Sequence, residues 1–166
     1  MSKLTLSSLV PQSFDRQYFL VFKYVGYAGL GASLAINAYR TLKLLKLNIA
    51  VGGDSYEPLY GLSCELRIIA GKNILETLEL FVLVEDDASF QIMSEEPSAF
   101  DSVLTKSHAF PMLHRVEVAI WWYSESMDLD GMSPVMENLK KNKFSRLVES
   151  KAVEFNFNTQ IGRAHV

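Results

Sequence analysis

The chain has 166 residues, of which 49% are hydrophobic and 21% are charged, a composition that suits a single folded domain with one core. The longest stretch without a charged residue covers residues 24–39, fewer than the roughly 20 residues that a membrane-spanning helix needs, and residues 4–10 are too short for a secretory signal. The lone cysteine, Cys64, excludes an internal disulfide and a cysteine-based zinc site.

The formal net charge of −3 conceals an uneven distribution of charge along the chain. Residues 1–50 carry six basic groups and one acidic group, residues 51–102 carry two and eleven, and the remainder carries eight and seven. This pattern suits one surface for an anionic partner and another for a cationic partner or a second copy of the chain. Ordinary solvated surfaces explain it equally well.

The first half of the chain is expected to form a strand, a helix and a hairpin. Residues 18–25, YFLVFKYV, are rich in aromatic and β-branched side chains and predict a buried strand. Residues 33–47 predict a helix with leucines on one side and Arg40, Lys43 and Lys46 on the opposite side. Two further strands are predicted over residues 59–70 and 75–84, joined by a turn at residues 71–73.

The second half begins with a stretch that lacks periodicity, residues 85–114, which predicts a long and partly mobile loop with a short helix at 98–104. In this loop Phe90, Ile92 and Met93 lie among acidic residues. These three side chains could mediate self-association, or they could pack on the core. A strand at residues 115–123, a helix at 134–143 with a basic end, and a last strand at 152–157 follow. We find no internal repeats.

The sequence offers little that indicates catalysis. His108 and His114 are six residues apart, without a cysteine or carboxylate at metal-ligand spacing, and Cys64 has no evident partner histidine. The glycines of GYAGLG, residues 26–31, do not have the spacing of the dinucleotide-binding fingerprint. We therefore predict no catalytic, cofactor-binding or metal-binding residues and do not expect an enzyme.

The order of the predicted elements resembles the matrix proteins of rhabdoviruses, in particular the short, plant-virus-like members. In the first half the resemblance lies in FLVFKYVGY, SLAINAYRTLKLLKL and LYGLSCELRIIAG, and in the second in HRVEVAIWWYSESMD and MENLKKNKFSRLVESKAVEFNF. The resemblance covers residues 18–158. The family's lysine-rich arm and proline-rich late-budding motif are not found in this sequence. The resemblance implies one α+β domain, a mostly antiparallel sheet packed with two or three helices, after a flexible segment at residues 1–17.

The resemblance also implies a function in virus assembly. A matrix protein condenses the viral nucleocapsid, binds the inner face of the membrane, contacts the envelope glycoprotein and self-associates to drive budding. It is found in the virion beneath the envelope and in the host cytoplasm and membrane periphery. The resemblance would make Phe90, Ile92 and Met93 self-association residues. The residues expected to bind the anionic membrane or the nucleocapsid are Arg40, Lys43, Lys46, Lys140, Lys141, Lys143 and Arg146.

The residues themselves leave two other classes of function open. A cellular α+β module could bind a small molecule or a protein in a cleft beside its sheet, and would need no cofactor. An enzyme is the third option, although the acids and bases of the chain do not cluster at a recognisable spacing.

The last part of the chain, residues 159–166, is expected to be a tail. Its final six residues, IGRAHV, read like the translation of a common sequencing adapter. We therefore expect residues 161–166 to be non-biological and the natural C-terminus to be missing.

Overall fold

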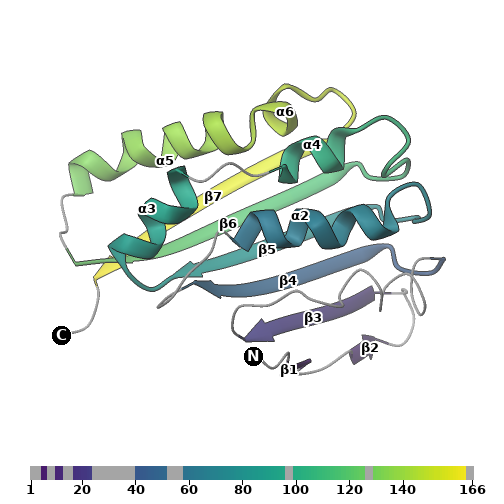
Figure 1. The fold of residues 1–166 in the computed structure, drawn as a ribbon, viewed down its shortest axis with the longest axis horizontal. Helices are drawn as coiled ribbons and strands as arrows, with labels where there is room; N and C mark the ends of the chain where they lie inside the picture. The colour runs from purple at the N-terminus through teal and green to yellow at the C-terminus, as the bar shows by residue number, and fades with distance from the viewer. Residues whose placement is uncertain are drawn as a thin grey trace.

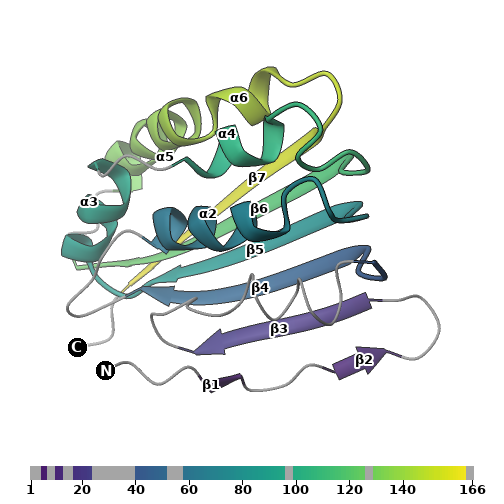
Figure 2. The same cartoon turned by 45° about the vertical axis from the view of Figure 1, so that its right-hand side comes forward.

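The computed structural model describes residues 5–6, 10–12, 17–23, 40–51, 58–95, 99–125 and 129–163. These residues form one sheet with a layer of helices (Figures 1 and 2). The elements are, in chain order, β1 (Thr5–Leu6), β2 (Val10–Gln12), β3 (Gln17–Lys23), β4 (Leu44–Val51), α2 (Pro58–Ile69), β5 (Thr77–Val84), α3 (Asp87–Glu95), α4 (Phe100–Thr105), β6 (Arg115–Ser124), α5 (Leu129–Lys143), α6 (Ser145–Glu149) and β7 (Glu154–Arg163).

The strands are arranged in the order β1-β3-β4-β5-β6-β7, and β3 to β7 run parallel to one another. Among the described strands, the short β1 and β2 are the ones that pair with β3 in the antiparallel sense. The fold is therefore α/β, and the prediction of a mostly antiparallel α+β sheet is wrong. From β4 onward, consecutive strands are joined by segments that contain helices. Such crossovers bring each strand back in the same direction, which hairpins cannot do.

The predicted hairpin is absent because residues 59–70 form most of helix α2 instead of a strand. Leu59, Leu62, Leu66 and Ile69 recur at intervals of three or four residues and are at most 1% exposed, so the period is helical. Gly71, with φ +76°, follows the helix, and a glycine adopts this left-handed conformation without steric cost. The residues predicted to turn a hairpin therefore follow the end of a helix.

Two further predictions about secondary structure are wrong. Leu44–Val51 forms β4 instead of the end of a helix, because Leu45, Leu47 and Ile49 alternate with exposed or half-buried residues; residues 33–39 lie outside the described residues. The predicted loop at 85–114 contains α3 as well as α4, and α4 matches the short helix predicted at 98–104.

Five further elements were predicted correctly in type, whereas β1, β2 and α6 were not predicted. Strands β3, β5, β6 and β7 and helix α5 correspond to the predictions at residues 18–25, 75–84, 115–123, 152–157 and 134–143. Strand β7 is longer than predicted and includes residues 159–163 of the expected tail, three of which (161–163) were expected to be non-biological.

The parallel strands repeat a sequence pattern that the prediction of no internal repeats missed. The pattern is L-x-x-L-x-L, with valine in place of two leucines in the third copy, and every apolar member is at most 5% exposed. Its members are Leu42, Leu45 and Leu47 at β4, Leu75, Leu78 and Leu80 at β5, and Leu113, Val116 and Val118 at β6. The sheet register aligns the last two positions of all three copies. The pattern is similar to the first part of a leucine-rich repeat, in which each unit adds one strand.

Backbone hydrogen bonds show the same repetition. The carbonyl oxygen of Lys43 accepts the N–H groups of Glu76 and Thr77, and the carbonyl oxygen of Glu76 accepts those of His114 and Arg115. The next unit starts similarly, because the N–H of Glu154 donates to the carbonyl oxygen of His114. Each unit is therefore held to the preceding one at the same place, just before its strand.

One helix N-terminus is supported by a residue from another helix, and this gives a testable prediction. Asp101 in α4 is 7% exposed, and its Oδ2 accepts the backbone N–H of Arg146 at 3.0 Å, near the start of α6. The residue that precedes α6, Phe144, makes no side-chain cap of its own. We expect Asp101→Ala to lower the free energy of unfolding by about 1–2 kcal/mol, as for loss of a helix cap.

Equilibrium urea denaturation followed by circular dichroism would measure this effect. Asp101→Asn keeps an oxygen acceptor and should recover part of the loss. Glu137→Ala, an exposed change on α5, is the matched control. An Asp101→Ala variant as stable as the control would show that α6 does not depend on this contact.

Candidate binding surface on the open sheet face

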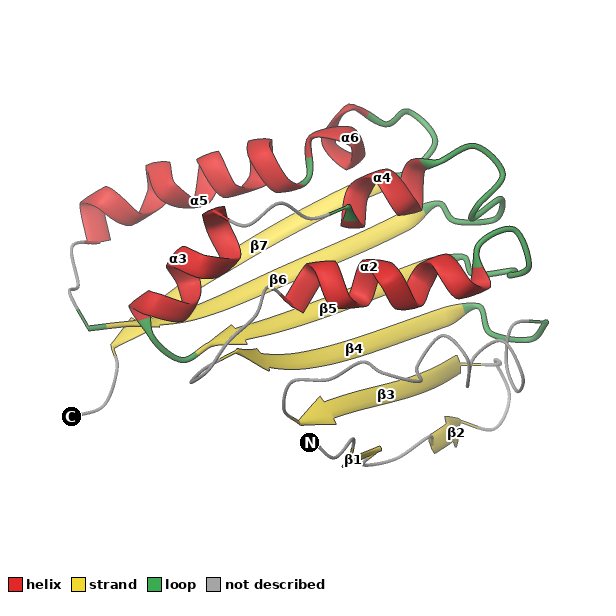
Figure 3. Cartoon of the chain, viewed as in Figure 1, coloured by secondary structure: helices red, strands yellow, loops and turns green. Residues whose placement is uncertain are grey.

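The helices that the structure describes all cover the same face of the parallel sheet (Figure 3). Side chains alternate along each strand, and one set is buried beneath the helices. The other set lies on the opposite face, which no described helix covers. We call this the open face. Its residues are Leu44, Lys46, Asn48 and Ala50 on β4, Thr77, Glu79, Phe81 and Leu83 on β5, Arg115, Glu117, Ala119, Trp121 and Tyr123 on β6, and Glu154, Asn156, Asn158 and Gln160 on β7.

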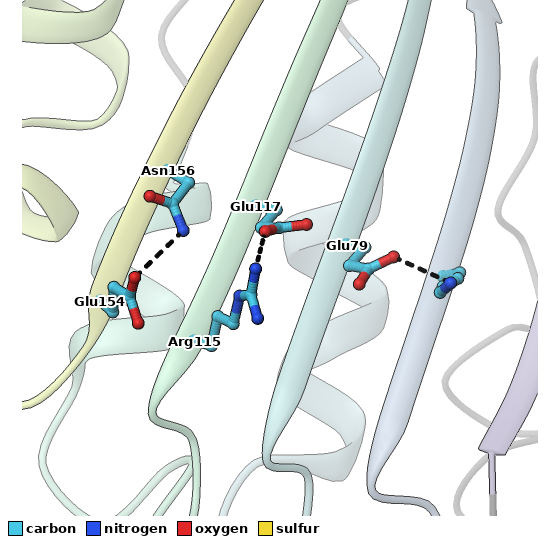
Figure 4. Close-up of polar contacts among 6 residues, drawn as sticks. Glu79, Arg115, Glu117, Glu154 and Asn156 are labelled. Atoms are coloured by element: carbon cyan, nitrogen blue, oxygen red, sulfur yellow. Dashed lines mark hydrogen bonds and ion pairs between the residues drawn. The ribbon is translucent and has the colours of Figure 1, made fainter.

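Charged and polar side chains occupy the half of the open face nearest the amino ends of the strands (Figure 4). Lys46 Nζ lies 3.3 Å from Glu79 Oε2, and Arg115 forms an ion pair with Glu117 two residues further along its own strand. The hydrogen bond to Glu117 raises the pKa of Arg115 above its usual value, and the charges of Glu117, Glu154 and Glu79 act in the same direction. Arg115 is therefore a cation in a field of carboxylates.

Apolar side chains occupy the other half of the open face. The rings of Phe81 and Trp121 meet edge to face, with centroids 5.3 Å apart and an interplanar angle of 67°. Trp121 is 39% exposed, a high fraction for so large an apolar side chain, and its neighbours in register are Leu83 and Gln160. Aromatic side chains with an exposed surface of this kind are typical of binding surfaces.

A shallow hollow of about 210 Å³ lies where the two halves meet. Its open-face residues come from four adjacent strands and are Lys46, Asn48, Glu79, Phe81, Glu117, Ala119 and Asn158. Ala119 is the smallest of them and stands between Phe81 and Asn158 in register, so the sheet is lower there than on either side. The lining combines two carboxylates, two amides, an amine and an aromatic ring.

Charge is separated between the two ends of the strands. The described loops at the amino ends carry Lys43, Lys72, Lys106 and Lys151 beside a single carboxylate, Glu76, on the segment before β5. The carboxyl ends carry Glu85, Asp86, Asp87 and Glu125, with Arg163 at the end of β7. Helix dipoles explain part of this separation, because α3 starts with Asp87 and α5 ends with three lysines. The carboxyl ends of β5 and β6, next to the apolar half of the open face, are therefore strongly acidic.

The structure separates the first group of predicted basic residues. Arg40 lies exposed in a turn and Lys43 precedes β4, where its Nζ pairs with Glu76 Oε1 at 2.9 Å. Lys46 lies on the open face. They do not share a helix face. The second group lies together at the junction of α5 and α6, where Lys141 and Arg146 are exposed, Lys140 is half-buried and Lys143 is only 5% exposed.

The residues predicted for self-association lie in α3, mostly in contact with the core. Phe90 and Met93 are 4% and 0% exposed, and Ile92 is half-buried. The ring of Phe90 stacks on Trp122 with centroids 3.8 Å apart and planes within 6°. This placement agrees with the packing interpretation of the same residues.

The sequence prediction missed the open face as a site. Glu79, Phe81, Glu117 and Trp121 were visible as one side of two alternating strands, but nothing indicated that those strands are adjacent and parallel. The L-x-x-L-x-L pattern contains that signal, because it places equivalent positions of successive units side by side.

Other kinds of site find no support among the described residues. No group of three or more histidine, cysteine or acidic side chains there is placed to hold a metal ion. Within the same ranges, no helix has the length and apolar character needed to cross a membrane. No protein-family model, curated protein or solved structure matches the chain.

Proposed function

We propose that the chain is a non-enzymatic binding module that recognises a partner protein with its open face. The single observation that carries this proposal is the Phe81–Trp121 pair, in which a half-buried and an exposed aromatic ring meet on a sheet face that no described helix covers. Repeating α/β units place equivalent side chains in rows across a sheet, and such proteins characteristically bind partners on that extended surface.

The composition of the open face supports a protein partner. Interfaces commonly have a centre of aromatic and apolar side chains with a polar rim, and tryptophan is among the residues that contribute most to affinity. Here Phe81, Leu83 and Trp121 form an apolar centre, and charged or amide side chains adjoin it on β4, β5, β6 and β7. The surface is a shallow one, which suits the side chains of a protein better than an enclosed small molecule.

The prediction of a viral matrix protein remains untested. The element order on which the resemblance rested is not the one observed, because residues 59–70 are helical and residues 85–114 contain two helices. The basic residues at the α5–α6 junction are the part of that prediction that the structure keeps together. Sedimentation with anionic liposomes over a salt series would test it: salt-sensitive binding that is lost on charge reversal of Lys140, Lys141 and Arg146 would favour membrane association.

Peptide selection would test the proposed function directly. A phage-displayed library of 12-residue peptides would be selected against the full chain, and the affinities of the enriched peptides would be measured by fluorescence anisotropy. We expect Trp121→Ala to weaken binding by about tenfold or more, because an exposed tryptophan at the centre of an interface commonly contributes over 1.4 kcal/mol.

A matched control is available on the helical side of the molecule. Ile68 in α2 is 46% exposed, so Ile68→Ala removes a similar kind of exposed apolar side chain away from the open face. It should leave the affinity of the selected peptides unchanged. A selection that yields no peptide sensitive to Trp121→Ala would contradict the proposed function.

A further inference from the structure

We propose that the partner segment is basic, and that one of its lysine or arginine side chains enters the hollow between Glu79 and Glu117. This inference rests on the proposed function of the open face and adds the chemistry of the partner.

The two carboxylates lie on adjacent strands. Glu79 and Glu117 are register partners on β5 and β6, and the backbones of neighbouring strands run about 4.8 Å apart. Like charges at directly paired positions repel each other and destabilise a sheet. A cation bound between them would relieve that repulsion, whereas a partner carboxylate would increase it.

The carboxylates of Glu79 and Glu117 can accept further hydrogen bonds. The ion pair from Lys46 engages Oε2 of Glu79, and the one from Arg115 engages Oε1 of Glu117. A carboxylate can accept roughly four hydrogen bonds through its two oxygens. Both groups therefore keep acceptor sites while paired, and both line the hollow. Figure 4 shows Glu79 and Glu117 side by side on their strands, with Arg115 below Glu117 on β6.

The rest of the lining suits a cation. The hollow has a volume of about 210 Å³, which is enough for the end of a long side chain. Phe81 offers a ring that attracts a cation, and the side-chain oxygens of Asn48 and Asn158 can accept hydrogen bonds. Two cations oppose the bound one: the ammonium group of Lys46, which lines the hollow and is held by Glu79, and the guanidinium of Arg115, which does not line the hollow and is held by Glu117.

The surface beyond the hollow is mostly acidic. Towards the carboxyl ends of β5 and β6 the charged residues are Glu85, Asp86, Asp87 and Glu125, and on the adjacent β7 Arg163 is in register with Ser124. The acidic residues therefore outnumber the basic one. An extended segment that leaves the hollow over Phe81 and Trp121 therefore approaches carboxylates. Its charge complement is a run of basic residues, and its binding should weaken as salt screens these interactions.

The test uses the peptides selected against the full chain. Peptides that bind the open face should be enriched in arginine and lysine and should bind less tightly in 0.5 M NaCl. In each peptide, replacement of the essential arginine by citrulline, which is neutral and similar in shape, should weaken binding by about tenfold. Glu79→Gln and Glu117→Gln should each have a comparable effect. Circular dichroism and urea denaturation would verify that both variants are folded, since the partly exposed ion pairs contribute little to stability.

Glu154→Gln is the matched control, because Glu154 lies on the open face but does not line the hollow. It should change the affinity less than twofold. Peptides that lose affinity with Trp121→Ala but are neutral or acidic, or that bind the Glu79→Gln and Glu117→Gln variants like the wild type, would overturn this inference and leave the proposed function standing. Peptides indifferent to Trp121→Ala as well would overturn both.

Discussion

The substitution Phe144→Ala is expected to lower the free energy of unfolding by about 3–5 kcal/mol, the usual cost of truncating a fully buried phenylalanine. Phe144 is 0% exposed and lies between α5 and α6. The centroid of its ring is 6.0 Å from that of Phe100, and 5.5 and 5.6 Å from those of Phe155 and Phe157 on β7. The cavity would therefore open between the last two helices and the last strand.

Urea denaturation followed by circular dichroism would measure the loss. Because single domains are typically stable by only 5–15 kcal/mol, the variant should be strongly destabilised. Phe144→Leu, which keeps much of the apolar volume, should cost clearly less. Val148→Ala is the matched control in α6, since Val148 is 46% exposed. A Phe144→Ala variant as stable as this control would show that β7 does not depend on the aromatic cluster.

The strands were easier to predict than their arrangement. Strand β6 has apolar residues at every second position and a matching buried pattern, and this period of two is a local property that the sequence displays. Whether two successive strands run parallel or antiparallel depends on what joins them. The prediction of an antiparallel hairpin was wrong because LYGLSCELRII was assigned a period of two. Its leucines recur at intervals of three and four, which is a helical period.

The segment LKLLKL shows why local periodicity can be ambiguous. Leu42 and Leu45 are three residues apart, as on a helix, whereas Leu45, Leu47 and Ile49 alternate, as on a strand. The L-x-x-L-x-L pattern contains both spacings, because its first leucine precedes the strand and packs beneath it. The repeats were also hard to recognise because Leu42, Leu75 and Leu113 are separated by 33 and 38 residues, so no single period fits.

The open face could not be predicted before the strand order was known. Glu79 and Glu117 are 38 residues apart in the sequence and become neighbours only through the parallel register of β5 and β6. The basic residues were easier to notice, because Lys140, Lys141 and Lys143 are close together along the chain. The sequence therefore drew attention to these lysines, which interact favourably with the dipole at the end of α5. It did not reveal the open face, which the fold assembles from separate strands.

The second large effect is expected at Asn73, which joins consecutive units of the sheet. Asn73 is 6% exposed, and its Nδ2 donates to the carbonyl oxygens of Ile69 and Ala109, each at 2.9 Å. Its Oδ1 accepts the N–H of Leu75 at 3.2 Å. One side chain therefore links the end of α2, the segment before β5 and the loop before β6.

We expect Asn73→Ala to lower the free energy of unfolding by about 3 kcal/mol, because it removes three buried hydrogen bonds and leaves the N–H of Leu75 without its acceptor. Asn73→Asp keeps the acceptor but turns an oxygen towards the carbonyl oxygens of Ile69 and Ala109, so it should be at least as destabilising at neutral pH. Urea denaturation would measure both, with Asn138→Ala on the exposed surface of α5 as the control.

The comparison between the two Asn73 variants identifies what holds the units together. In a repeat architecture each unit contacts mainly its neighbours, so stability depends on the junctions between units as well as on the units themselves. If Asn73→Asp is as stable as the wild type, the two donated hydrogen bonds are dispensable, and the junction depends on the leucine rows alone. A large loss in both variants would show that the junction between the units depends on a buried polar link as well as on apolar packing.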